Sequence, residues 1–201
     1  MTNRIEDILH FWFGAFPTPY TADTSKADMW FKNGADYDTQ IFVQFGVDYE
    51  KAINGELDHW LDSHRGRLAL IILLDQFSRH IHRGTAEAFA QDARAQEICI
   101  EGIGAGDDAR AHAVERSFFY LPLEHAEDIE KQNLSIRAYT QLVKDVPPPY
   151  QKPFEVTLSF AKSHHFVIDK FGRFPELNEI LGRESTAAEL EFIASGKYSF
   201  L

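Results

Sequence analysis

The stretch Leu68-Ala69-Leu70-Ile71-Ile72-Leu73-Leu74 is the longest uninterrupted apolar run in the chain. Seven such residues in a row can form either a buried strand or a helix that is apolar on every side. No second strand pattern exists to pair with the run, so we expect the central helix of the fold here. The run is also much shorter than the roughly 20 residues that a membrane-spanning helix needs.

Helical spacing continues on both sides of this central segment. Residues 5–12, 36–53 and 150–168 place apolar side chains at helical intervals, and Thr186 with Glu189 forms a capping box for the last helix. We expect Asp107 or Asp108 to cap a helix that reaches Tyr120. We expect Pro122 to open another helix, which runs with a bend to about Val146.

These segments predict an all-α fold in one domain over residues 1–201. About eight to ten helices with short links favour antiparallel neighbours in a compact array. The triple proline at 147–149 is the strongest internal boundary. No clean sequence repeat is readable.

Composition excludes several classes of function. The formal net charge of −11 repels phosphate backbones, so we expect no nucleic-acid partner. There is no run of Lys or Arg to bind an acidic membrane surface. Cys99 is the only cysteine, which excludes an internal disulfide and a Cys-based zinc site and indicates a buried inert thiol. The N-terminus lacks the features of a signal peptide, so we expect a cytoplasmic location.

Two ionisable residues follow the apolar run directly. Asp75 and Arg79 are four residues apart, so they share a helix face and can form an ion pair. Such a pair can simply close a buried helix end, where the helix dipole favours cations. The alternative interpretation is a pocket wall at the mouth of the helical array.

A second candidate group follows Pro122. Acidic residues such as Glu124 are favoured in a first helical turn, which needs no ligand to explain it. His125 and Asp128 are three residues apart and share one side of the predicted helix. A histidine oriented by a carboxylate is also how general bases and metal ligands are prepared.

The third candidate lies in the 150–168 helix. His165 is close to the centre of the apolar stripe, with His164 on the other flank, and Asp169 four residues later can hold its ring. A lone inward histidine is usually a satisfied core residue. The presence of a second His–carboxylate pair in the same chain favours a functional site.

Motifs for known chemistries are largely missing. The sequence has no Gly-rich phosphate loop, no nucleophile elbow and no H-E-x-x-H. Glu56-x-x-His59 and the weaker Asp7-x-x-His10 do not supply the two Glu-x-x-His pairs of a di-iron bundle. We therefore predict no metal site, and the cofactor stays unknown.

Several longer segments carry a family resemblance. They are Trp30-Phe31, residues 55–57 with Trp60, residues 68–79, residues 119–128, residues 171–175, and residues 181–183 with Ser185-Thr186. In order and spacing the chain resembles the bacterial family catalogued as domain of unknown function 924. The resemblance implies an α-helical array of tetratricopeptide-like type and carries no established activity.

The chain departs from that family pattern at two places. His80 stands where the family tends to have Asn, and Glu176-Leu177-Asn178 stands where it tends to have His-Arg-Asn. A site that depends on the His-Arg pair would be altered here, so Glu176 and Leu177 are left out of the predicted site.

Two functional hypotheses follow. In the first, an inter-helix pocket binds a small molecule with an anionic group. Acid–base chemistry comes from two pairs, His125-Asp128 and His165-Asp169. The ligand is bound by Asp75, Arg79, Glu124 and Arg173. In the second, the protein is a tetratricopeptide-like scaffold that holds protein partners in a groove or forms a homo-oligomer. A third interpretation is a buried polar network with a purely structural role.

Overall fold

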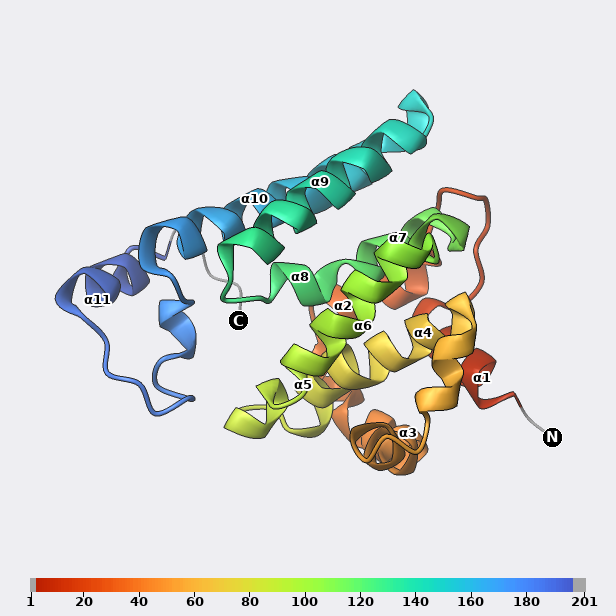
Figure 1. Ribbon diagram of the computed structural model, residues 1–201, viewed down its shortest axis with the longest axis horizontal. Helices are drawn as coiled ribbons and strands as arrows, with labels where there is room; N and C mark the ends of the chain where they lie inside the picture. Colours follow the sequence, from red (N-terminus) through yellow and green to blue (C-terminus); the bar gives the residue numbers. More distant parts are fainter. Residues whose placement is uncertain (1–2, 197–201) are drawn as a thin grey trace.

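The computed structural model describes residues 3–196, and helices dominate that range (Figure 1). The α-helices are α1 (Arg4–Phe13), α2 (Ala27–Phe31), α3 (Asp38–Ile53), α4 (His64–Ile71), α5 (Ser78–Ile81), α6 (Asp92–Ala105), α7 (Ala113–Phe119), α8 (Leu121–Glu124), α9 (Ile129–Asp145), α10 (Gln151–Phe171) and α11 (Ala187–Ala194). Within residues 3–196 no β-strand forms beyond an isolated bridge between Thr18 and Thr21. The predicted all-α class is therefore confirmed.

The apolar run at 68–74 is a helix at the centre of the core, as predicted. Helix α4 leads into a π-helical segment, Ile72–Phe77, which continues into α5. Each side chain from Leu68 to Leu74 is at most 1% exposed. Ser63 caps the start of α4 through a hydrogen bond from the Gly66 amide. A Cβ at Gly66 would lie 2.2 Å from the Trp60 carbonyl oxygen, so glycine is required for this close approach.

Helices α9 and α10 form a long antiparallel hairpin that crosses one side of the molecule (Figure 1). Tyr139 on α9 and Ala161 on α10 are buried in the main core, so the hairpin and the N-terminal helices share one core. At its turn, Gln151 donates hydrogen bonds to the carbonyls of Val143 and Val146, which satisfies the end of α9. The triple proline lies at this turn.

A smaller apolar cluster lies at the far end of the hairpin, next to α11. It contains Val167, Ile168 and Phe174. The capping box predicted for Thr186 and Glu189 is present at the start of α11. Arg173 donates hydrogen bonds from Nε and Nη2 to the carboxylate of Glu189, at 2.6 and 2.9 Å. This ion pair connects the end of α10 to α11.

Two predicted helix boundaries are wrong. Helix α7 begins after His112, whose Nδ1 accepts the Val114 amide while Glu115 accepts the His112 amide. Asp108 instead accepts a hydrogen bond from the Tyr120 hydroxyl at 2.6 Å.

The helix predicted from Pro122 to Val146 is also interrupted. Helix α8 ends at Glu124, and α9 begins after Asp128, whose carboxylate accepts the amides of Glu130 and Lys131. This cap stabilises a new helix start, so residues 125–128 form a loop rather than a bend.

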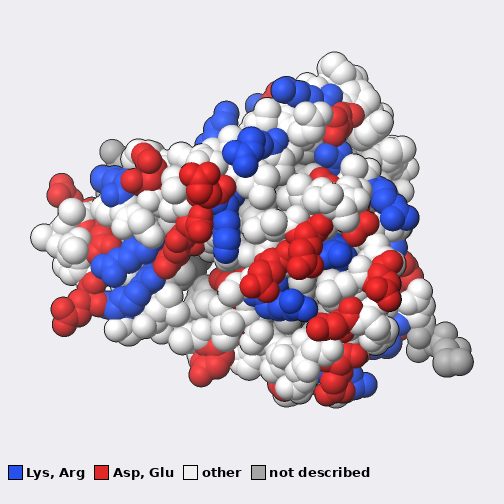
Figure 2. All heavy atoms as spheres, viewed as in Figure 1, with Lys and Arg blue, Asp and Glu red and all other residues white. Residues whose placement is uncertain are grey.

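On the face shown in Figure 2, acidic and basic side chains are interspersed rather than gathered in one basic area. Within the described residues, none of the helices is both long and apolar enough to cross a membrane.

Candidate functional site

A cavity of 830 Å³ lies between the central helix and the α9–α10 hairpin. Its walls come from α2, the segment around α5, α7, α8, α9, α10 and residues 174–180. The aromatic lining residues include Trp30, Phe31, Phe89, Phe118, Phe160 and Phe174. The polar ones include Gln76, Arg79, His80, Glu124, His125 and His164. A mostly apolar wall with a few converging polar groups is typical of small-molecule sites.

Asp75 is the buried anion behind this cavity. Its side chain is 0% exposed, and it accepts hydrogen bonds from His125 Nδ1 at 2.8 Å and Gln76 Nε2 at 2.5 Å. Arg79 Nη1 lies 3.1 Å from the same carboxylate. Burial alone would raise the pKa of Asp75, but the charges of Arg79 and His125, with these hydrogen bonds, outweigh it and lower the pKa. Asp75 is therefore an ionised carboxylate in the interior.

Asp75 and Gln76 belong to the π-helical segment, Ile72–Phe77. A π-turn is a rare interruption of an α-helix, and such turns are frequent at functional sites. Here the interruption falls on the two residues that hold the His125 side of the cavity. Residues 68–79 contain no proline or glycine that would have indicated this π-turn from the sequence.

Arg79 connects two carboxylates. It binds Asp92 with both terminal nitrogens, at 2.8 and 3.0 Å, and donates a further hydrogen bond to the Asp75 carbonyl at 2.8 Å. Burial raises the pKa of Asp92, opposed by Arg79 and assisted by the nearby charge of Asp75. Arg79 also lies over the Phe89 ring, 5.3 Å from its centroid. Its guanidinium is thus held by internal partners.

His125 links the buried network to the cavity, because its side chain is 20% exposed and lines the cavity wall. Because the ionised carboxylate accepts a hydrogen bond from Nδ1–H, the neutral ring carries its lone pair on Nε2. No residue in the range 3–196 makes a hydrogen bond to that Nε2. A histidine held in this way can accept a proton from a ligand.

His164 forms a second His–carboxylate pair. Its Nδ1 lies 3.0 Å from Glu124 Oε1 and 2.9 Å from the Phe160 carbonyl oxygen, and the Glu124 side chain is 5% exposed. The ring centroids of His125 and His164 are 6.3 Å apart. Two carboxylate-held imidazoles therefore line one cavity.

His80 forms a third pair at another part of the lining. Its Nδ1 lies 2.7 Å from Asp38, which also binds Arg83 at 2.6 and 2.8 Å. Burial lowers the pKa of His80, although Asp38 opposes this shift. The ring packs edge-on against Trp12 with centroids 5.7 Å apart.

Four of the eight predicted site residues converge on this cavity: Asp75, Arg79, Glu124 and His125. The partner predicted for His125 is wrong, because Asp128 caps α9 and the ring instead meets Asp75 from a distant helix. Local sequence separation cannot reveal such a long-range partner.

The other predicted residues lie elsewhere. His165 Nε2 bonds Asn133 at 3.0 Å across the hairpin, and in the described range no hydrogen bond or ion pair joins it to Asp169. Arg173 holds Glu189 in the small C-terminal cluster. The predicted His165–Asp169 pair is therefore wrong in its geometry, and neither residue lines the cavity.

His164 is the functional candidate that the helical wheel assigned to the flank. Phe154, Ala161 and Ile168 mark the buried face of α10. His164 lies three residues after Ala161 and His165 lies four residues after it, so the helical period allows either histidine to face inward. Glu176 and Leu177, excluded because they depart from the family pattern, do line the cavity. Gln76 and the aromatic lining carried no separate sequence signal.

The described residues contain no group of three or more His, Cys, Asp or Glu side chains arranged to hold a metal ion. Cys99 is buried, as expected, and burial raises the pKa of its thiol.

These features define an all-α protein with histidines beside buried carboxylates at the wall of a cavity. The sequence profile of a family described as bacterial proteins of unknown function (DUF924) matches residues 8–197, so the chain belongs to this family.

A solved structure, a protein of unknown function, ATU0120, from Agrobacterium tumefaciens, is similar to this chain. The two are 34% identical with a TM-score of 0.81, over 96% of this chain and 98% of that one. A search of curated proteins gave no significant match.

Proposed function

We propose that the cavity binds a small organic molecule and that His125 exchanges a proton with it as a general base. The observation that carries this proposal is the 2.8 Å contact between His125 Nδ1 and the fully buried Asp75 at the cavity wall. The carboxylate fixes the tautomer and the orientation of the ring. The same arrangement prepares histidines for proton transfer in many enzymes.

The surroundings support a chemical role over a purely structural one. A buried ionised carboxylate is costly unless it is paired, and replacing such pairs by apolar residues is often neutral or stabilising. Arg79 also pairs with Asp75, although it shares its single charge with Asp92. His125 adds a ring whose Nε2 is not bonded by the described part of the chain.

The His164–Glu124 pair supplies a second proton-transfer group to the proposed site. Its ring centroid lies 6.3 Å from that of His125, which is close enough for both rings to contact one small ligand. One imidazole would then accept a proton while the other donates one, as acid–base catalysis requires.

Hydrolysis of 4-nitrophenyl acetate tests the reactivity of His125, because a basic imidazole attacks this ester or activates water towards it. We expect His125→Gln to lower the protein-dependent rate by about tenfold or more. The matched control is His59→Gln, since His59 is an exposed histidine outside the cavity. An unchanged rate in a folded His125→Gln protein would overturn the proposal.

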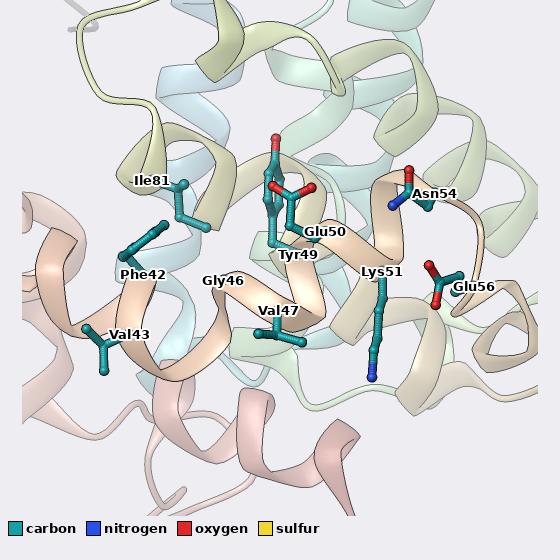
Figure 3. Close-up of a pocket in the computed structure, with 10 residues that line it drawn as sticks. All are labelled: Phe42, Val43, Gly46, Val47, Tyr49, Glu50, Lys51, Asn54, Glu56 and Ile81. Atoms are coloured by element: carbon teal, nitrogen blue, oxygen red, sulfur yellow. The ribbon is translucent and has the colours of Figure 1, made fainter.

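A second candidate function, self-association as an interaction scaffold, is favoured by an apolar stripe on α3. Phe42, Val43 and Val47 are 60%, 75% and 70% exposed. They line a shallow groove of 540 Å³, where Phe42 lies beside Ile81 of α5 (Figure 3). Two copies related by a two-fold axis could cover each other's stripe without another partner. Light scattering tests this: a dimer that Val47→Glu converts to monomer supports it, and a wild-type monomer contradicts it.

A further inference from the structure

The charges around the cavity bear on the ligand that the proposed site accepts, so this inference rests on the proposed function. Three carboxylates surround the two imidazoles at this part of the cavity: Asp75, Asp92 and Glu124. Arg79 is the cation that faces them, and it is bound to two of the three. Among the described side chains of this region, the carboxylates therefore outnumber the arginine that faces them.

The rest of the lining offers no unpaired arginine among the described residues. Arg83 is held by Asp38, as Arg79 is by Asp75 and Asp92. Within a partly desolvated site, an anionic ligand group near His125 is repelled, whereas a neutral or cationic group is not.

Another part of the lining is aromatic. Trp30 lies 4.8 Å from Phe118 and 5.9 Å from Phe31, measured between ring centroids. Phe31 is 68% exposed although it lines the cavity, so its ring is available to a ligand. A planar apolar body would bury its surface against these rings.

We infer that the ligand has an aromatic or other apolar body, seated near Trp30 and Phe31, and an alcohol or amine head group that donates a hydrogen bond to His125 Nε2. Carboxylates and phosphates are excluded as head groups by the negative surroundings. This replaces the anionic group expected from the sequence, because the two arginines that suggested it, Arg79 and Arg173, are each bound by a carboxylate of the protein.

Three probes with the same phenyl body test this inference: 2-phenylethanol, 2-phenylethylamine and phenylacetate. Their binding to the full chain is measured by titration calorimetry and by quenching of tryptophan fluorescence. We expect the alcohol and the amine to bind at least about tenfold more tightly than phenylacetate. Glu124→Gln removes one negative charge at nearly constant shape, so it should narrow this difference.

Two variants place the body of the probe. Phe31→Ala should weaken the binding of 2-phenylethanol by about three- to tenfold. Phe42→Ala is the matched control, because Phe42 is also an exposed phenylalanine but lies outside this cavity. Equal loss in both variants would place the probe elsewhere and overturn the inference.

The outcomes separate this inference from the proposed function. If phenylacetate binds as well as the alcohol, or if none of the probes binds, the ligand class is wrong. The ester assay on His125→Gln then still decides the general base independently. If His125→Gln leaves the ester hydrolysis rate unchanged while the alcohol and the amine bind selectively, the inferred ligand class is supported and the proposed role of His125 as a general base is contradicted.

Discussion

Replacing Arg79 with Met removes one cation from two carboxylates at once. Arg79 lies 3.1 Å from Asp75, which is 0% exposed, and 2.8 Å from Asp92. Breaking a buried ion pair on one side typically costs about 3–5 kcal/mol, because the remaining charge is left uncompensated. The Arg79 side chain is 23% exposed, so we expect the lower end, about 3 kcal/mol of unfolding free energy.

Urea unfolding followed by far-ultraviolet circular dichroism measures this loss. About 3 kcal/mol is a large fraction of the roughly 5–15 kcal/mol that holds a typical domain together, so the midpoint should fall clearly. The control is Arg137→Met, which replaces an exposed arginine of α9 and should change stability by less than about 0.5 kcal/mol. A loss below about 1 kcal/mol in Arg79→Met would refute the reasoning.

The pH dependence gives a second readout. In the wild type the pKa of Asp75 is lowered, so its stabilising contribution is complete above the unfolded value of 3.8 and is lost as the pH falls below it. In Arg79→Met, only His125 and Gln76 still oppose the effect of burial, so we expect the pKa of Asp75 to rise above the unfolded value. A raised pKa gives stability below the unfolded value that is lost as the pH rises through the folded one. The stability gap between variant and wild type should therefore widen from pH 4 to pH 7, and a constant gap would contradict this.

Two further predictions concern helix packing and the C-terminal cluster. Gly102→Ala should cost about 1–3 kcal/mol, because its Cβ would lie 2.5 Å from the buried Phe119 ring. Gly104→Ala lies in the same helix, but its added Cβ would have nothing within 4 Å, so it should instead stabilise the protein by about 0.5–1 kcal/mol. Thermal unfolding of both variants measures the two effects, and equal effects would contradict the packing argument. Hydrogen bonds from Arg173 and the Thr186 amide lower the pKa of Glu189 to about 2, so the docking of α11 should hold above pH about 4.5 and weaken as the pH falls towards 2. An NMR titration of the α11 amides measures this, and the same pH profile in Glu189→Gln would contradict it.

The helical class could be predicted because the signals for it are local. The run at 68–74 has no strand to pair with, and the Thr186–Glu189 box depends on residues three apart. The break at 125–128 was missed although its cause is also local. Asp128 was interpreted as the partner of His125, whereas an aspartate before a helical run is a strong N-cap. His112 is an unusual cap, so the start of α7 gave a weaker signal.

Only part of the candidate site could be predicted from the sequence. Polar residues set among apolar ones showed which segments carry the site, and Asp75 and His125 were both found in this way. Their pairing was not predictable, since 50 residues separate them and only the tertiary fold, in which α6 packs against both α8 and the central helix, brings them together. On α10 the helical period leaves two adjacent histidines nearly equivalent, and a rotation of about 100° per residue decides which one enters the cavity.

The histidines of this chain show how a structural imidazole differs from the one proposed to act. His112 uses both ring nitrogens inside the fold: Nδ1 accepts the Val114 amide at 3.1 Å, and Nε2 meets the Thr18 carbonyl at 2.7 Å. Only the neutral Nε2–H tautomer satisfies both bonds, so this ring is fully committed to capping α7. His125 has the reverse arrangement. One nitrogen is held by an ionised interior carboxylate, and the other is left unbonded by residues 3–196 on a ring that lines a cavity. A network that existed only for stability would be expected to use that second nitrogen too, as His112 does, because an unmet polar group adds nothing to the fold.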